Sequence, residues 1–452
     1  MKLAGGAGLA VSLLIYVLRL DRVVGLTIDD GWYVLLAKSL ATGQGFTVIN
    51  SPSPGILPLY PPGFPALLSI FYRFSPGFPD NIWLLKSVSV AAMLGMGILA
   101  YLYLVHTRRA PAHVAFLIAL AATLCPPLVF LATSTVMSEC VFAFVLVATI
   151  VVVERSVRAC REGGGGAMRY VIAGAALASY AFLIRSIAVA MIGGLFLYFL
   201  KERLIRAALV FAAAAALLTG PWVIYSRLHA PTPDQMREQG GHIIQPYTTQ
   251  FWQRVASVTT ADRITTAELP SRVWNNILEI AGKDVLRVVA APLYEVLRDP
   301  YKEAQQLLAA RSNGMNSDQT TDTLFLSYLL SLFILIGFVA AARRRIRGAE
   351  FVIPAMLLLT VLWPWETIRF VLPLAPFLLY YFAMGIRAVY RLVRSASTEQ
   401  ASWIAPAAVM ALAVAISLYG HLGYIAKKFG DPLDRPQWLQ TFDDVETMMA
   451  WI

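Results

Sequence analysis

Two adjacent carboxylates, Asp29 and Asp30, follow the first apolar stretch of the chain, in the sequence TIDDGWYVLLAKSLATGQGF (residues 27–46). A carboxylate beside a membrane can take a proton from a reacting hydroxyl and so act as a general base. Acids are also favoured in the first turn of a helix, where the helix dipole is positive. Capping needs only one acid, and desolvating a second one near lipid is costly. The pair is therefore a candidate catalytic site with a structural alternative.

Four further charged residues interrupt apolar sequence: Lys86, Glu139, Arg185 and Arg369. Guanidinium groups match the oxygens of a phosphate, so Arg185 and Arg369 are candidate phosphate ligands, and Lys86 is a third. Long cationic side chains at helix ends also extend to lipid headgroups, which is the structural alternative. An acid within an apolar helix needs a partner, and we expect Glu139 either to pair with Arg185 or to contact substrate.

Aromatic and histidine residues accompany these charges. Tyr33 and Tyr60 are candidate substrate contacts, although tyrosine and tryptophan at such boundaries are more typical of an interfacial belt, as for Trp363 and Trp365. His229 and His242 share a long polar segment and could join the acids around a divalent metal. No cluster has the spacing of metal ligands, so we assign no metal residues.

The composition indicates what positions these side chains. Of 452 residues, 58% are hydrophobic and only 14% are charged, against roughly a quarter charged in soluble domains. This deficit runs along the whole chain and indicates an all-α, multi-pass membrane protein. The net charge of +10 does not indicate nucleic-acid binding, because the basic residues lie mainly in short connections between apolar stretches.

Apolar stretches of helix length predict about eleven transmembrane spans. They lie near residues 3–20, 82–105, 111–131, 135–153, 169–184, 187–200, 204–226, 322–342, 350–363, 368–386 and 402–423. With the N-terminus inside, every inner connection is rich in Arg or Lys and the short outer turns are not, as the positive-inside rule requires. An odd number of spans then places the C-terminus outside.

Three segments face outward in this topology: residues 21–81, 227–321 and the tail. In the first, we expect a short interfacial helix that starts in the box-like pattern Thr27–Asp30 and ends at Gly43 and Gly45. A second short helix follows Pro62. We divide the chain into a transmembrane catalytic domain, 1–426, and an outer tail, 427–452, whose last residues resemble the start of a further soluble domain.

The order of these features resembles that of the GT-C glycosyltransferases, in particular lipid A aminoarabinose transferases and protein O-mannosyltransferases. Those enzymes carry Asp-Glu-x-x-(Tyr/Phe) after the first span, which here reads Asp29-Asp30-Gly31-Trp32-Tyr33. The segments STVMSECVFAF, AFLIRSIAVAMIGG and WETIRFVLPLAPFLLYY, at 134–144, 181–194 and 365–381, are also similar. Two departures stand out. Asp30 replaces the usual Glu, and Tyr60 stands where aminoarabinose-type relatives have Lys before the proline pair.

The resemblance implies transfer of a hexose or pentose from a polyprenyl-phosphate donor to a lipid, glycan or protein acceptor on the outer side, with inversion. It implies Asp29 as the catalytic base, and an extracytoplasmic site in a plasma membrane, with a bacterial inner membrane favoured. No nucleotide-binding signature is present, as suits a donor already activated on a lipid. The alternatives are a lipid or sugar transporter or flippase, which should carry charges at mid-membrane, and an inactive scaffold relative.

Overall fold

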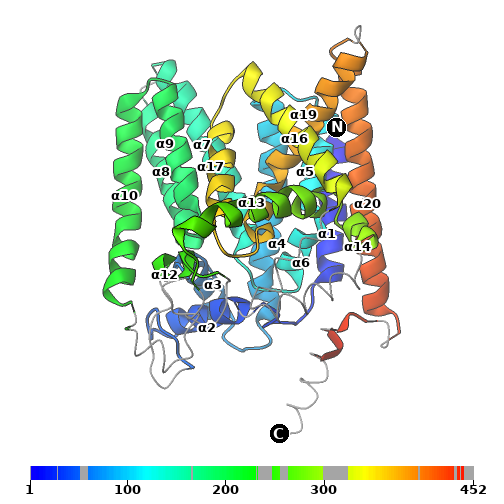
Figure 1. Ribbon diagram of the computed structural model, residues 1–452. Coiled ribbons are helices and arrows are strands. Elements are labelled where there is room, and N and C mark those ends of the chain that lie inside the picture. The colour runs from blue at the N-terminus through cyan, green and yellow to red at the C-terminus, as the bar shows by residue number, and fades with distance from the viewer. Residues whose placement is uncertain are drawn as a thin grey trace.

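A computed structural model describes residues 2–27, 29–50, 60–163, 166–230, 232, 247–254, 263–298, 324–394, 398–431, 435–437 and 439–441. Within these ranges the regular structure is helical, and the one β-type contact is an isolated bridge between Gln253 and Arg263. The helices form an elongated bundle (Figure 1). This is expected in lipid, because a helix satisfies its own backbone hydrogen bonds. The predicted all-α, multi-pass architecture is confirmed.

Seven described helices are long and apolar enough to cross a membrane, or eight if one bent pair counts as a single span. They are α4 (Ile82–His106), α7 (Glu139–Arg161), α8 (Ala167–Ile184), α10 (Ile205–Leu228), α16 (Phe325–Arg344), the continuous α18, η4 and α19 (Ile368–Val371, Leu372–Leu374, Ala375–Val393) and α20 (Ile404–Phe429). Three apolar helices are shorter: α1 (Lys2–Arg19), α9 (Ala188–Lys201) and α17 (Ala349–Leu362). An apolar helix thus lies at every predicted stretch, while the number of true crossings stays a prediction.

The stretch predicted as one span at 111–131 consists of two helices. Two helices, α5 (Ala112–Thr123) and α6 (Pro126–Thr133), meet there at 48°. Pro126 and Pro127 have no N–H to donate, so the helical hydrogen bonding stops before them. The carbonyl of Leu124 at the break lies 2.9 Å from Nε2 of His421 on α20. The break therefore keeps its backbone polar group satisfied, as burial requires.

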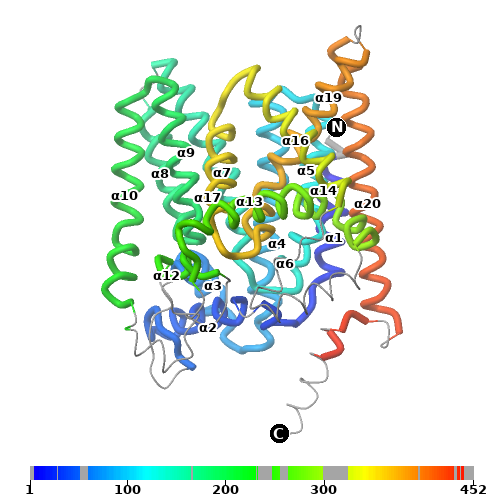
Figure 2. The backbone as a smooth tube through the Cα atoms, viewed as in Figure 1, coloured from blue at the N-terminus to red at the C-terminus, as the bar shows by residue number. Residues whose placement is uncertain are grey.

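Two groups of helices lie on opposite sides of the central helices α4 and α7. In Figure 2, α8, α9 and α10 lie on one side and α1 and α20 on the other, while α13 (Leu269–Glu279) crosses the front and leads through η2 (Ile280–Asp284) into α14 (Val285–Leu297). The two helices predicted in the first loop are present as α2 (Asp29–Ala41) and α3 (Gly63–Phe74), and they pack on each other at the end where α1 finishes. Gly43 and Gly45, both with positive φ, follow α2 as expected.

The end of the bundle opposite α2 and α3 is basic. Basic residues close the last turns of α7, α9, α16 and α19 there (Figure 1). The other end is not free of them, because Arg19, Arg227, Lys427 and Lys428 lie in the last turns of α1, α10 and α20. The orientation in the membrane, and the outward position of the tail, stay predictions. Most of the tail, including residues 442–452, lies outside the described residues.

A buried polar network ties the helices at this basic end. Glu350 of α17 accepts two hydrogen bonds from the guanidinium of Arg108, at 2.7 and 3.1 Å, and a third from the Tyr381 hydroxyl at 2.8 Å. Nε of Arg108 also donates to the Tyr103 hydroxyl, which in turn donates to Glu154 on α7. The network joins α4, α7, α17 and α19 at one level, away from the acids of the first loop.

Helices α16 and α19 approach each other through two glycines. A Cβ atom at Gly337 would overlap the backbone carbonyl of Tyr381, and one at Gly385 would overlap that of Phe333. Small residues allow such close helix crossings in membranes, where van der Waals packing takes over from the hydrophobic effect. The contact holds α16 against the most buried long helix of the bundle.

We expect Gly337→Ala to lower the melting temperature of the purified protein in detergent. The added methyl group forces the two backbones apart, and overpacking of this kind costs about 1–3 kcal/mol. The matched control is Gly193→Ala on α9, where a Cβ meets nothing within 4 Å. Equal melting temperatures for the two variants would show that the glycine contact does not limit stability.

Candidate active site

The two acids of the first loop occupy different environments. Asp29 begins α2 and has a side chain that is 21% exposed. The Asp30 carboxylate is buried and accepts hydrogen bonds from the backbone N–H groups of Gly25, Thr27 and Gly31, at 2.8, 3.3 and 3.0 Å. The hydroxyl of Thr27 donates to the sulfur of Met137 instead of completing a reciprocal capping box. Asp30 thus holds the loop that enters α2, and Asp29 is left to face other helices.

Asp29 makes two strong contacts through its two oxygens. Oδ1 accepts a hydrogen bond from the Tyr60 hydroxyl at 2.5 Å, and Oδ2 pairs with Nη2 of Arg369 at 2.6 Å. Burial, followed by the Asp29 charge, raises the pKa of Tyr60 well above its usual value, so Tyr60 stays a neutral donor. An ionised carboxylate has about four acceptor positions. Asp29 therefore keeps acceptor capacity for an incoming hydroxyl.

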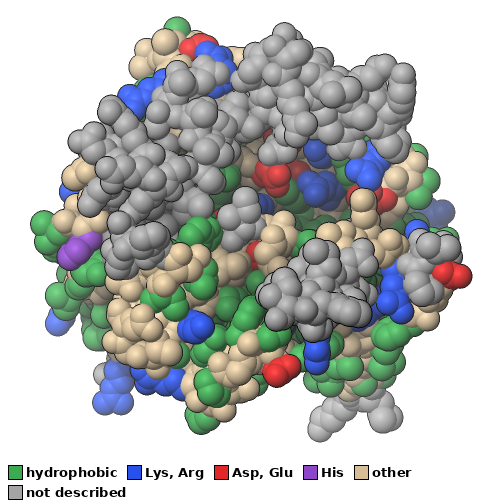
Figure 3. All heavy atoms as spheres, turned by 90° about the horizontal axis from the view of Figure 1, so that it is seen from below, with side chains coloured by type: hydrophobic (Ala, Val, Ile, Leu, Met, Phe, Trp, Pro, Cys, Tyr) green, Lys and Arg blue, Asp and Glu red, His purple; other side chains and the backbone are tan. Residues whose placement is uncertain are grey.

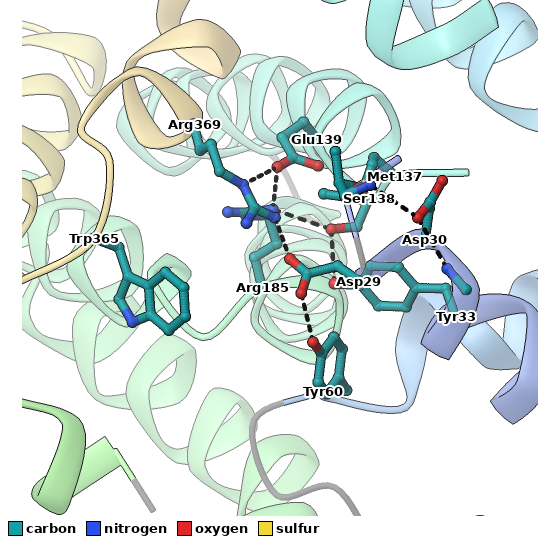
Figure 4. Close-up of polar contacts among 12 residues, drawn as sticks. Asp29, Asp30, Tyr33, Tyr60, Met137, Ser138, Glu139, Arg185, Trp365 and Arg369 are labelled. Carbon is teal, nitrogen blue, oxygen red and sulfur yellow. Dashed lines mark hydrogen bonds and ion pairs between the residues drawn. The ribbon is translucent and has the colours of Figure 1, made fainter. Parts of the chain in front are cut away.

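Glu139 links the two candidate phosphate ligands. It is fully buried at the first turn of α7, and its Oε1 lies 2.8 Å from Nη1 of Arg185 and 3.0 Å from Nε of Arg369. The expected approach of Glu139 and Arg185 is present, and Arg369 joins them, which the sequence did not indicate. Figure 4 shows the two guanidinium groups side by side between Glu139 and Asp29. We call Asp29, Glu139, Arg185 and Arg369 the charge cluster.

The arginines are not saturated by these contacts. Arg185, whose side chain is 10% exposed, uses Nη1 for Glu139 and for the Ser138 hydroxyl. Arg369, 24% exposed, uses Nε and Nη2. Among the described residues, no contact involves Nε or Nη2 of Arg185, or Nη1 of Arg369. A guanidinium has five N–H donors, so both groups can still bind an anion.

Tyr33 and Ser138 lie next to the charge cluster and contact each other. The Tyr33 hydroxyl lies 3.1 Å from the Ser138 hydroxyl, and its ring packs edge-on against those of Tyr60 and Phe64. Burial raises the pKa of Tyr33, which therefore stays protonated. Tyr33 thus reaches the charge cluster through Ser138. Ser138 was missed in the sequence, although it directly precedes Glu139.

Lys86 lies in a separate, internal ion pair. Its side chain is fully buried, and Nζ contacts the Asp21 carboxylate at 2.8 Å, the Asp21 carbonyl at 2.9 Å and the Thr133 carbonyl at 3.0 Å. An ammonium group has three donors, so all three are used within the protein. The geometry gives no support to Lys86 as a phosphate ligand, and we do not propose that role. It ties the end of α1 to α4 and α6.

The turn between α17 and α18, which precedes Arg369, is anchored by α13 and η2. The Asn276 amide donates to the carbonyls of Val361 and Trp363 at 3.0 and 2.9 Å. The Thr367 hydroxyl donates to the buried Asp284 carboxylate at 2.5 Å. These contacts hold the turn on both sides of Trp365. They therefore fix the backbone position from which the Arg369 side chain extends.

No group of three or more potential metal-ligating His, Cys, Asp or Glu side chains gathers among the residues that the structure describes. His229 lies exposed at the end of α10, stacked on Tyr225. His242 lies outside the described residues.

Figure 3 views the end of the bundle where α2 and α3 lie, and it shows acidic and basic side chains side by side in a recess of this face.

No known family model and no curated protein sequence matches the chain. Solved structures of low similarity were found, and they are GT-C fold glycosyltransferases. ArnT from Cupriavidus metallidurans bound to undecaprenyl phosphate has a TM-score of 0.47 and 15% identity, over 93% of this chain and 75% of that one. AglB, the archaeal oligosaccharyltransferase from Archaeoglobus fulgidus, in complex with an inhibitory peptide and a dolichol-phosphate, has a TM-score of 0.45 and 15% identity. That match covers 91% of this chain, which spans 56% of AglB.

Proposed function

We propose that this protein is a membrane glycosyltransferase that moves a sugar from a polyprenyl-phosphate donor to an acceptor hydroxyl on the extracytoplasmic side. The observation that carries the proposal is the charge cluster, which sets a partly exposed carboxylate beside two arginines with unused donors. The order of the sequence motifs, which resembles that of GT-C enzymes, supports it independently. The acceptor class stays open among lipid, glycan and protein.

The two arginines bind the donor phosphate in this proposal. Arg185 offers Nε and Nη2, and Arg369 offers Nη1, so the phosphate oxygens can be bound without breaking either contact to Glu139. Hydrogen bonds between charged partners are short and strong, and guanidinium groups suit phosphate geometry. As the sugar departs, the leaving phosphate gains negative charge, and cations already in position stabilise it without reorganisation.

Asp29 acts as the general base. The acceptor oxygen attacks the anomeric carbon from the face opposite the phosphate, the bond from that carbon to the phosphate oxygen breaks, and the hydroxyl proton passes to Asp29. Inversion follows from this single displacement. The leaving group is an anion that needs no proton, so one carboxylate is enough, unlike the pair that glycosidases need. Asp30, through its three backbone contacts, holds α2 so that Asp29 keeps its place.

The contact between Arg369 and Asp29 has a chemical consequence for the order of binding. A guanidinium 2.6 Å from the carboxylate occupies one oxygen of Asp29 through a charge-assisted contact. A donor phosphate competes with Asp29 for Arg369 and so frees that oxygen to accept a hydrogen bond from the acceptor hydroxyl. We therefore expect productive acceptor binding to follow donor binding.

Asp29→Asn should abolish transfer while donor binding is retained. Loss of a general base lowers rates by about 10²–10⁴-fold. Donor affinity should be equal to or tighter than that of the wild type, because Arg369 loses its competing anion. Transfer is measured with radiolabelled polyprenyl-phosphate sugars, and donor binding by titration. Asp80→Asn, on an exposed residue of the same loop, is the matched control. Wild-type transfer by Asp29→Asn would remove Asp29 from this role.

Arg185→Ala and Arg369→Ala should each weaken binding of undecaprenyl phosphate. Charge-assisted contacts are worth roughly 1.5–3 kcal/mol, which corresponds to about 10- to 150-fold in affinity. The matched control is Arg227→Ala, an exposed arginine in the last turn of α10 at the same end of the bundle. An equal, small effect for all three variants would mean that Arg185 and Arg369 only contact lipid headgroups.

A further inference from the structure

Trp365 lies in the outer turn between α17 and α18, four residues before Arg369, and its side chain is partly exposed. In Figure 4 its indole and Glu139 lie on opposite sides of the guanidinium groups of Arg185 and Arg369. In that view the ring lies on the side of the two guanidinium groups away from Glu139. The sequence suggested only an interfacial belt position for this residue.

The orientation of this ring is fixed from its edge. Nε1 of Trp365 donates to Oε1 of Gln250 at 3.2 Å, and Gln250 is buried on α12 (Tyr247–Phe251). Helix α12 is itself held next to the cluster, because the Ser186 hydroxyl, adjacent to Arg185, donates to the Tyr247 hydroxyl at 3.0 Å. A hydrogen bond at the edge of the indole restrains its orientation and uses neither of its faces.

The neighbouring Trp363 has a different environment. Its ring packs against Tyr247 and Phe251, with centroids 5.8 and 6.1 Å apart, and its carbonyl accepts from Asn276. No aromatic ring packs on Trp365 within the part of the chain that the structure describes. Both tryptophans of this turn are partly exposed. Trp363 packs against two aromatic rings, and Trp365 is held by a hydrogen bond at its edge.

We propose that Trp365 is the surface on which the sugar ring of the lipid-phosphate donor stacks. The inference rests on the proposed function and makes it more specific. The sugar is bonded directly to the phosphate, so a phosphate held by Arg185 and Arg369 places that sugar beside them. The negative face of an indole attracts the weakly positive C–H groups on one face of a sugar. Trp365 thereby sets the sugar, and with it the anomeric carbon, relative to Asp29.

The alternative occupant of the ring is the prenyl chain, which also carries phosphate at its end. The sugar is favoured because the exposed Glu366 follows Trp365 in the turn, and a carboxylate accepts hydrogen bonds from sugar hydroxyls. An isoprenyl chain has no hydroxyl to donate to it. The two occupants predict different responses to a lipid that lacks the sugar, and the test below uses that difference.

The experiment measures binding of undecaprenyl phosphate and of undecaprenyl-phosphate glucose, galactose, mannose and arabinofuranose to the full chain in nanodiscs. We expect wild type to bind at least one sugar-bearing lipid more tightly than the bare phosphate. Trp365→Ala should lower the affinity for that lipid roughly 2- to 10-fold, the range typical of aromatic contacts. The affinity for undecaprenyl phosphate should stay unchanged. Trp365→Phe should restore most of the difference in affinity between the sugar-bearing lipid and the bare phosphate. The control Trp363→Phe keeps a ring at the position that packs against Tyr247 and Phe251.

Three results would overturn the inference. If Trp365→Ala lost affinity equally for the bare and the sugar-bearing lipids, the ring would contact the prenyl chain or serve only to keep the protein folded. An unchanged sugar preference in that variant would assign the sugar to other residues, while the phosphate site and the proposed function still stand. Failure of wild type to bind any of the five lipids would overturn the proposed function and this inference with it.

Discussion

Two guanidinium groups repel each other, and they lie side by side in this protein because a fully buried carboxylate lies between their helices. Glu139 contacts Arg185 at 2.8 Å and Arg369 at 3.0 Å through one oxygen, while its other oxygen is buried without a hydrogen-bond partner among the described residues. Leaving such an oxygen unpaired costs free energy. Two charge-assisted contacts offset that cost, and removing the acid would leave Arg185 without its ion pair and Arg369 paired with Asp29 alone.

The site is assembled from segments far apart in the chain. Asp29 comes from the first loop, Glu139 from the start of α7, Arg185 from the turn between α8 and α9, and Arg369 from α18. Each is a residue at a helix end, where the side chain can reach a neighbouring helix and the backbone remains regular. Transporters place charges at mid-membrane, between halves of broken helices. Here the charges gather at one end of the bundle, as suits chemistry on a lipid headgroup.

Much of this arrangement follows from the sequence. Apolar stretches of helix length located every long helix, and the basic connections between them mark the end of the bundle opposite α2 and α3. The pairing of Glu139 with Arg185 was predictable because an acid in an apolar helix needs a cation at similar depth. Sequence did not distinguish Lys86 from the arginines, since its partner Asp21 is 65 residues away and its carbonyl acceptors depend on tertiary packing. The contact of Arg369 with Asp29 and the orientation of Trp365 also depend on how loops dock. The proline pair at 126–127 marks the helix break in the sequence, although the apolar run around it continues without interruption.

The buried network around Glu350 has a mechanical meaning for the opposite end of the bundle. Because Arg108, Tyr381 and Glu350 lock α4, α17 and α19 together at the basic end, and Gly337 and Gly385 interlock α16 with α19, α19 has little freedom to slide along its neighbours. Helices α4, α16, α17 and α19 are thus joined into one unit at the basic end. If the proposed lipid donor enters by a movement of the protein, these contacts leave that movement to α2 and to the turn before α18, at the opposite end.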